Sequence, residues 1–330
     1  MSATRSRAAG TRRAAGEAAA RGLRAGFLWA SRRRRLARLA AGSSLTRGIV
    51  QRFVAGEDLP AALRVLDRLH ARGLATTVDV LGESVTTVQA AHAAADRYID
   101  VLDALAERGL DRNVSVKLTQ LGLDLEPALC RENLMRILAH AAELNAFVRV
   151  DMEDHTHTQA TIELVRQLHA VYPGVGVVVQ AYLRRSAADV AMLNADRVRV
   201  RLCKGAYDEP PDVAFAHKPD VDENFRRLAE SLLRDGEYPA LATHDELLVA
   251  WARGFADRER IDRSRFEFQM LYGVRRDLQE RLVAGGYTVR VYVPFGTEWY
   301  PYFMRRLAER PANVLFLTRS VLGERRRPRR

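Results

Sequence analysis

Hydrophobic residues recur along this chain in two alternating patterns. The first clear unit is DLPAALRVLDRLHARG (58–73), in which apolar residues return at helical spacing and a glycine closes the segment. A β-rich run, TTVDVLG (76–82), follows it, and the same alternation continues down the chain. Seven further β-like runs are NVSVKLTQLG (113–122), AFVRVDMED (146–154), VGVVVQAYL (175–183), RVRVRLCKGAY (197–207), PALATHD (239–245), FEFQMLYG (266–273) and TVRVYVPFG (288–296).

The eight β-like runs alternate with helical patterns, which predicts a parallel sheet. Eight such units in about 250 residues are the count and size of a (β/α)₈ barrel. A doubly wound open sheet is the alternative, but no strand is followed by the G-x-G-x-x-G fingerprint of dinucleotide-binding folds. The segment GVGVVV (174–179) has two glycines but runs into a strand. We therefore predict an α/β barrel.

The composition is typical of a soluble globular protein. Of 330 residues, 48% are hydrophobic and 28% are charged. Cys130 and Cys203 fit neither a disulfide framework nor a metal-ligand spacing, which favours a reducing cytoplasm. No uninterrupted apolar stretch approaches the roughly 18 residues of a membrane span, so we expect no transmembrane helix.

The net charge of +11 is concentrated at the two ends of the chain. Residues 1–48 hold twelve arginines and one acid, and residues 319–330 hold six arginines and one acid. When both ends are taken from the totals of 52 basic and 41 acidic residues, 34 and 39 remain. We predict a basic, partly disordered arm over 1–48, a barrel over 49–318 and a basic tail over 319–330.

The basic ends suggest an anionic partner. GFLWASRRRRLARLAAG (26–42) mixes Leu, Phe and Trp with an arginine run, as interfacial amphipathic helices do. We expect a cytoplasmic protein with peripheral contact to the inner face of the membrane through these ends. Nucleic acid is the alternative anionic partner, but we expect no specific nucleic-acid binding, because the body of the chain is mildly acidic.

Polar and ionisable residues gather where the predicted strands end. Active sites of barrels lie at the carboxyl ends of the strands. The chain has three lysines against 49 arginines, so a lysine marks a place where a compact or titratable amine is wanted. Two of the three are among the residues at or near these ends: Lys117; Asp151, Met152 and Glu153; Gln180 and Tyr182; Arg201, Lys204, Gly205 and Ala206; Thr243 and His244; Gln269 and Tyr272; Arg290 and Tyr292.

Several of these residues have simpler interpretations. Asp151 and Glu153 can cap the helix that follows them. His155 and His157 are spaced like a metal pair, but no third ligand has a suitable spacing, so we predict no metal. Lys117 can form a Schiff base with a carbonyl substrate, as in barrel aldolases.

The segment YFMRRLAER (302–310) places Arg305 and Arg306 side by side, with Glu309 one helical turn later. Arg305 and Glu309 have the i,i+4 spacing of a surface ion pair, worth a few tenths of a kcal/mol. The alternative is a pair of guanidinium groups that holds a carboxylate.

Eight motifs in order resemble those of proline dehydrogenase: KLTQLGL, DMED, VQAYLRRS, RLCKGAY, ATHD, FEFQMLYG, VRVYVPFG and RRLAERPAN. The match covers roughly 50–318. The resemblance implies a distorted (β/α)₈ barrel with extra N-terminal helices that binds FAD. It also implies oxidation of L-proline to Δ1-pyrroline-5-carboxylate, with a hydride passing from proline C5 to flavin N5 and the electrons then passing to a membrane quinone. The chain is too short for the aldehyde dehydrogenase domain of bifunctional relatives, so we expect a monofunctional enzyme.

The resemblance also assigns roles to residues. Asp151 and Arg201 are the implied catalytic residues, with Arg201 near flavin N5 and Asp151 in contact with Lys117. Lys117, Tyr292, Arg305 and Arg306 are implied to bind proline, the arginine pair through its carboxylate. Glu309 is implied to reach the flavin side. The implied FAD-binding residues are Met152, Gln180, Arg201, Lys204, Gly205, Ala206, Thr243, His244 and Glu309.

Two departures and three alternatives stand beside this interpretation. Cys203 replaces an expected aliphatic residue, and DHTHT (154–158) is more polar than the family pattern. A Schiff-base aldolase that uses Lys117 or Lys204 would be trapped by borohydride. A flavin barrel for another amine or a folate would not be reduced by proline. A non-enzymatic binder with basic tails would tolerate loss of Arg305.

Overall fold

The structure is a computed structural model that describes residues 50–309, with side chains described as far as Met304. The described residues fall into two compact units. One is Phe53–Thr297, and the other comprises 50–52 and 298–309. The predicted basic ends and the extra N-terminal helices lie outside the described residues, so the boundaries 1–48, 49–318 and 319–330 stay predictions.

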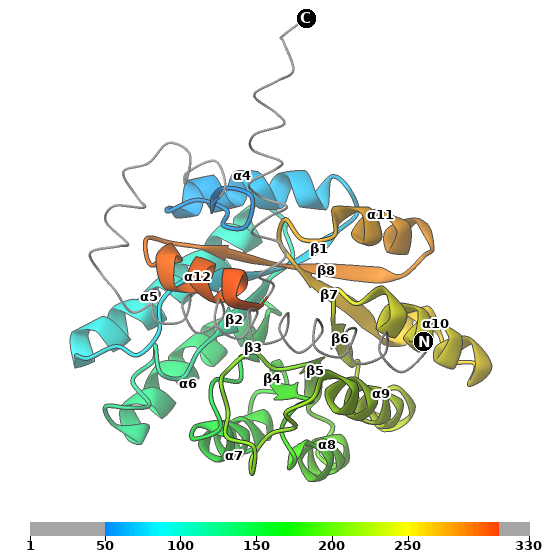
Figure 1. Ribbon diagram of the computed structural model, residues 1–330. Coiled ribbons are helices and arrows are strands. Elements are labelled where there is room, and N and C mark those ends of the chain that lie inside the picture. Colours follow the sequence, from blue (N-terminus) through cyan, green and yellow to red (C-terminus); the bar gives the residue numbers. More distant parts are fainter. Residues whose placement is uncertain (1–49, 310–330) are drawn as a thin grey trace, which may run out of the picture. The chain divides into compact units, whose positions relative to one another are not determined.

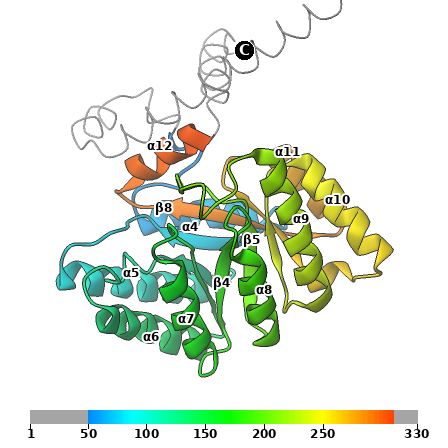
Figure 2. The same ribbon diagram turned by 60° about the horizontal axis from the view of Figure 1, so that its bottom comes forward.

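The unit Phe53–Thr297 is a closed barrel of eight parallel strands in sequence order, and β1 pairs with β8 to close it. Figures 1 and 2 show the helices arranged around these strands. The predicted (β/α)₈ fold is confirmed, and every predicted β-like run overlaps a strand. The strands are β1 Ala75–Val80, β2 Asn113–Val116, β3 Phe147–Val150, β4 Val175–Gln180, β5 Arg199–Cys203, β6 Ala240–Ala242, β7 Glu267–Leu271 and β8 Thr288–Phe295.

Helices precede and connect the strands. The described helices of the barrel are α4 Leu59–His70, α5 Val88–Glu107, α6 Pro127–Glu143, α7 Thr158–His169, α8 Ser186–Ala195, α9 Lys218–Asp235, α10 Glu246–Arg258, the short 3₁₀ helix η1 Arg263–Arg265, and α11 Arg276–Ala284. The other unit contains α12 Trp299–Glu309. Among the described residues, no helix is both long enough and apolar enough to span a bilayer.

Helix starts follow local chemistry. The carboxylate of Asp58 accepts a hydrogen bond from the backbone N–H of Ala61 at 2.7 Å, and Pro60 stands in the first turn of α4. Asp245 caps α10 in the same way, accepting from the N–H of Leu247 at 3.1 Å. Such caps fix where each loop at the carboxyl ends of the strands returns to a helix.

The apolar core lies between the strands and the helices. In each strand, alternate residues such as Val78, Val114 and Val148 are fully buried and belong to one hydrophobic cluster with helix residues such as Leu102 and Ile137. The residues between them face the interior of the barrel, because side chains alternate along a strand. This interior is polar. Its contacts form a lower level near the amino ends of the strands and an upper level near their carboxyl ends.

The lower level is a structural charge network. Glu267, at the start of β7, accepts from Arg290 Nε at 2.9 and 3.1 Å, and Arg290 also donates to the carbonyl of Thr76 at 2.7 Å. Gln269 also donates to Glu267. Gln269 was expected at the end of its strand but lies in the middle of β7. Arg290 lies on β8 as expected, near the start of that strand, and pairs in register with Ala75, the first residue of β1.

Candidate active site

The upper level of the interior is centred on Lys117, which directly follows β2. Its Nζ lies 2.8 Å from Oδ1 of Asp79 on β1 and 3.7 Å from Oδ2 of Asp151, which follows β3. It also lies 3.4 Å from the hydroxyl of Tyr292 on β8. The side chain of Lys117 is 11% exposed and that of Asp79 is fully buried. The predicted contact between Lys117 and Asp151 is therefore present.

Asp151 connects Lys117 with two further predicted site residues. Its Oδ1 accepts from Arg201 Nη1 at 2.7 Å, and its Oδ2 accepts from the Tyr292 hydroxyl at 2.7 Å. The Arg201 guanidinium also lies over the Tyr292 ring, 5.3 Å from its centroid. Four residues from four strands or strand ends are thus joined in one cluster.

The electrostatics of the cluster fix its protonation. Burial on its own lowers the pKa of Lys117, but Asp79 and Asp151 outweigh it and hold that pKa well above its usual value. Burial raises the pKa of Asp79, and Lys117 opposes this rise. Burial and the neighbouring Asp151 raise the pKa of Tyr292 well above its usual value, so its hydroxyl keeps its proton. Lys117 is therefore a fixed ammonium ion and Tyr292 a neutral donor.

Neither Asp151 nor Glu153 caps a helix. The helix that follows them, α7, begins at Thr158 with His157 as its N-cap. Glu153 instead accepts from the Thr119 backbone N–H at 3.0 Å and from the Thr119 hydroxyl at 2.6 Å. The capping interpretation was wrong because these residues lie several positions before the helix begins.

Arg201 and Gln180 each present a buried polar atom that is not satisfied. Arg201 Nη2 donates to the hydroxyl of Ser115 at 3.0 Å, but its Nε has no partner within the described part of the chain. Gln180 Nε2 donates to the carbonyl of Glu153 at 3.2 Å and lies 3.5 Å from that of Met152. Gln180 Oε1 likewise lacks a partner among the residues described. Buried groups of this kind normally have one, and these two lie on β4 and β5, beside one another in the barrel.

Lys204 follows β5 and is held by two carboxylates. Its Nζ lies 2.5 Å from Asp222 Oδ1 and 2.9 Å from Asp245 Oδ2. These contacts lower the pKa of Asp245 to about 2, although burial opposes the effect. Lys204 is therefore already paired, and it orders the loops after β5 and β6 rather than standing as a lone cation.

The remaining predicted cofactor residues lie in the same loops. The Thr243 hydroxyl accepts from the Asp245 backbone N–H at 3.1 Å. His244 Nε2 accepts from the Leu271 backbone N–H at 2.9 Å, which leaves its proton on Nδ1. Gly205 has φ of +105°, and a Cβ at this position would lie 2.1 Å from the Tyr182 ring. Ala206 follows it and is half-buried.

Arg305, Arg306 and Glu309 lie in α12. A helix was expected there, but their side chains fall outside those described. Their predicted contacts with proline and flavin stay predictions.

Sequence reasoning missed Asp79, Asp245 and Glu209. Asp79 could have been found, because it is an acidic residue inside the β-rich run 76–82, at a position that alternates with Val78 and Val80. Asp245 ends the motif ATHD and was not singled out. Glu209 lies in a loop and meets a partner 54 positions away, so no local pattern marks it.

Comparisons with known proteins bear on this cluster. The family model described as proline dehydrogenase matches residues 62–319. That span begins within α4, covers all eight strands and continues past α12. The chain belongs to the proline dehydrogenase family. It is accordingly an oxidoreductase with the activity of a proline dehydrogenase, the enzyme of the first step of proline catabolism.

Individual relatives of this proline dehydrogenase family agree. Proline dehydrogenase 1 of Bacillus subtilis subsp. natto is 40% identical over 300 residues, which are 91% of this chain and 99% of the relative. Proline dehydrogenase of Deinococcus radiodurans is 42% identical over 279 residues, 83% of this chain and 90% of the relative.

Among solved structures, proline utilization A (PutA) from Bdellovibrio bacteriovorus, inactivated by N-propargylglycine, matches with a TM-score of 0.75 and 28% identity. The match covers 79% of this chain and 32% of the longer protein. The predicted family and fold are both confirmed.

Proposed function

We propose that this enzyme oxidises L-proline to Δ1-pyrroline-5-carboxylate with FAD as cofactor and a membrane quinone as the final electron acceptor. The observation that carries the proposal is the joined cluster of Lys117, Asp151, Arg201 and Tyr292 beside two unsatisfied buried polar atoms. FAD, when bound, supplies the acceptor for a hydride from the carbon next to the proline nitrogen.

The residues present fit a flavin. Arg201 Nε is a buried donor and Gln180 Oε1 a buried acceptor, and neither has a partner in the described part of the chain. An isoalloxazine ring carries both kinds of partner along its edge. The left-handed backbone at Gly205 lets the chain pass close to a neighbour where a Cβ would collide. Arg201, Gln180, Met152, Lys204, Gly205, Ala206, Thr243 and His244 would hold the cofactor.

The chain's own groups would bind and orient proline. Lys117 is a fixed cation in the barrel interior and would attract the proline carboxylate. Arg305 and Arg306 would hold the same carboxylate through paired N–H groups. Asp151 fixes the Tyr292 hydroxyl, so the ring of Tyr292 is held in one orientation, against which the proline ring would pack.

The geometry opposes the aldolase alternative. A Schiff base requires a neutral amine, and lysines that form one have a lowered pKa. The pKa of Lys117 is instead held well above its usual value between two carboxylates. Lys204 Nζ is likewise held in ion pairs, with Asp222 at 2.5 Å and Asp245 at 2.9 Å.

The test is catalysis by Arg201 variants with L-proline and a soluble quinone analogue. Arg201→Met should lower kcat/KM by about 100-fold or more, since it removes a buried donor and a charge beside the reacting centre. Arg197→Met is the matched control, because Arg197 is 80% exposed and pairs with Glu237 on the surface. Equal activity of the two variants would contradict the assigned role, and a wild-type protein without proline-dependent quinone reduction would contradict the proposal itself.

We also propose a cytoplasmic location with peripheral contact to the membrane, where the quinone resides. The support is the arginine-rich composition of 1–48 and 319–330, since anionic lipid surfaces attract such segments. Deletion of 1–48 should reduce co-sedimentation with anionic vesicles. Unchanged co-sedimentation would remove the role of this segment.

A further inference from the structure

We propose that the buried carboxylate of Glu209 is a positioning group that fastens the segment 204–209 to the side chain of Tyr182. The inference rests on the proposed function, because this segment carries Lys204, Gly205 and Ala206, three of the proposed FAD-binding residues. Glu209 would act on the cofactor only through the backbone that it holds.

Glu209 is unusual for a loop carboxylate. The loop lacks regular secondary structure and Asp208 and Pro210 on either side are exposed, yet the Glu209 side chain is only 2% exposed. Burying a carboxylate is costly unless donors surround it. Glu209 Oε1 accepts from the Tyr182 hydroxyl at 3.1 Å and from the His155 backbone N–H at 3.0 Å, and Oε2 contacts His155 Nδ1. The burial is therefore matched by three specific contacts.

Tyr182 meets the same segment along its whole length. At the near end, its backbone N–H donates to the carbonyl of Lys204 at 2.9 Å. Its ring lies so close to Gly205 that a Cβ there would be 2.1 Å from a ring carbon. Its hydroxyl hydrogen-bonds to the backbone of Tyr207 and to Glu209 at the far end. The segment is thus joined to one tyrosine at Lys204, Gly205, Tyr207 and Glu209.

The hydroxyl of Tyr182 stays a donor. Burial and the Glu209 carboxylate raise its pKa above the usual value of a tyrosine, so the proton remains on the oxygen at neutral pH. Tyr182 is therefore the donor of the hydrogen bond to Glu209.

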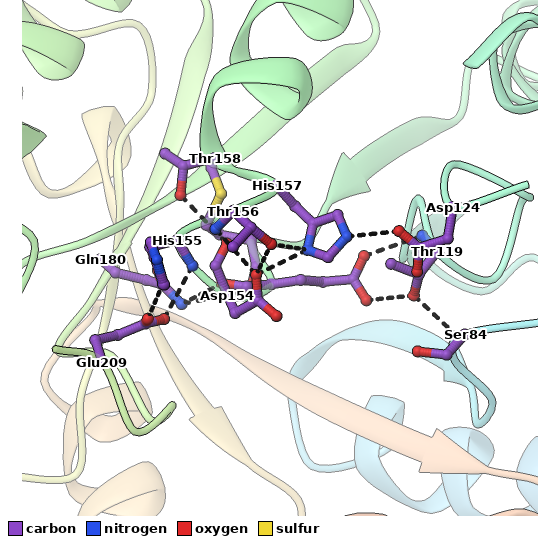
Figure 3. A network of polar contacts seen from close by, with 12 residues as sticks. Ser84, Thr119, Asp124, Asp154, His155, Thr156, His157, Thr158, Gln180 and Glu209 are labelled. Carbon is purple, nitrogen blue, oxygen red and sulfur yellow. Dashed lines mark hydrogen bonds and ion pairs between the residues drawn. The ribbon is translucent and has the colours of Figure 1, made fainter. Parts of the chain in front are cut away.

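His155 anchors Glu209 to the loop after β3, which carries the polar motif DHTHT (Figure 3). The next histidine, His157, contacts Asp154 at 2.9 Å and reaches Asp124, in the loop after β2, at 2.8 Å. Burial opposes the change, but the two aspartates raise the pKa of His157. The loops after β2, β3 and β5 are thus linked through polar contacts, and the polarity of DHTHT has a structural purpose.

Two variants and one control test the fastening in the full-length protein. Tyr182→Phe removes only the hydroxyl and keeps the ring against Gly205. Glu209→Gln keeps the shape but removes the charge that three donors share. Asp208→Asn is the matched control, because it neutralises the adjacent, exposed carboxylate.

Three measurements are made on each protein: the dissociation constant for FAD, the visible spectrum of the bound flavin, and hydrogen–deuterium exchange in peptides covering 204–209. Both test variants should weaken FAD binding by about tenfold, because a hydrogen bond to a charged group contributes at least that factor. They should also shift the flavin bands and speed exchange in 204–209. A general loss of stability would not shift the bands, and Asp208→Asn should match the wild type throughout.

The proposal is overturned if Tyr182→Phe folds and has the FAD affinity, flavin bands and exchange rates of Asp208→Asn. If Glu209→Gln does not fold, Tyr182→Phe alone decides. If the wild-type protein binds no FAD, the proposed function fails, and the exchange rates in 204–209 still decide whether Glu209 and Tyr182 fasten the segment.

Discussion

Replacement of Lys117 by methionine is the sharpest perturbation of the buried charge cluster. Asp151 would keep Arg201 at 2.7 Å and Tyr292 at 2.7 Å. Asp79 would keep no cation within salt-bridge distance among the described residues, because Lys117 is its one charged partner there. The side chain of Asp79 is fully buried, and its Oδ2 already lacks a partner in that part of the chain. The variant therefore leaves a single buried carboxylate without a cation, beside the Tyr292 hydroxyl.

The cost follows from the loss of one partner of a buried pair. Such a loss typically costs about 3–5 kcal/mol, since it leaves an uncompensated charge. For a domain of this size each kcal/mol lowers the melting temperature by about 2–4 °C. Lys117→Met should therefore melt at least about 6 °C below the wild type at pH 8.

The cost should shrink as the pH falls. Burial raises the pKa of Asp79, and Lys117 opposes that rise, so removal of Lys117 raises this pKa further. When the pKa of a carboxyl group is higher in the folded state than in the unfolded state, its protonated form stabilises the fold. This contribution is complete below the unfolded-state pKa of about 4 and is lost as the pH rises through the folded-state pKa. The difference in stability between variant and wild type should therefore widen from pH 5 to pH 8. The difference in the free energy of unfolding should widen by about 1.4 kcal/mol for each tenfold decrease that the substitution causes in the acid dissociation constant of Asp79.

The assay is thermal unfolding at pH 5 and pH 8, followed by circular dichroism. Lys218→Met is the control, since Lys218 is 70% exposed and its contact with Asp222 is a surface pair worth at most about 1 kcal/mol. A gap between the Lys117 and Lys218 variants that is absent at pH 8, or that does not change with pH, would refute the reasoning.

Three further predictions follow from single contacts. Gly205→Ala should lose bound FAD whereas Gly109→Ala should keep it, because both glycines have positive φ but only the first has a side chain in the way; equal FAD content would contradict this. Burial raises the pKa of Cys130 to about 12, so an aromatic disulfide reagent at pH 8 should modify Cys203 and spare Cys130 in the native protein; two modified thiols would show the explanation to be wrong. Arg305→Met should raise the KM for L-proline by about tenfold or more through loss of a charge-assisted contact, and an unchanged KM would remove Arg305 from the substrate site.

The barrel was predictable because the alternation of apolar and polar residues in each strand shows which of its faces is packed against the helices. One set of alternating positions faces the helices and is mostly valine or leucine, as at Val114 and Val148, so each run stands out. The strand-end rule also found the cluster, since Lys117, Asp151, Arg201 and Tyr292 do meet.

What sequence reasoning could not supply was register and long-range partnership. Gln269 was placed at the end of β7 because the pattern does not show at which residue that strand stops. Glu209 was missed because its burial is created by His155 and Tyr182, which lie on other loops. The pairing of Lys204 with two aspartates is also a tertiary fact, although each residue was visible in the sequence.

The visible spectrum of the purified protein, recorded without oxygen before and after addition of L-proline, tests the central claim most directly. The account predicts flavin bands that bleach on addition of L-proline and persist on addition of buffer. Flavin bands that L-proline leaves unchanged would contradict the assigned reaction, and a colourless protein that FAD does not reconstitute would contradict the cofactor as well.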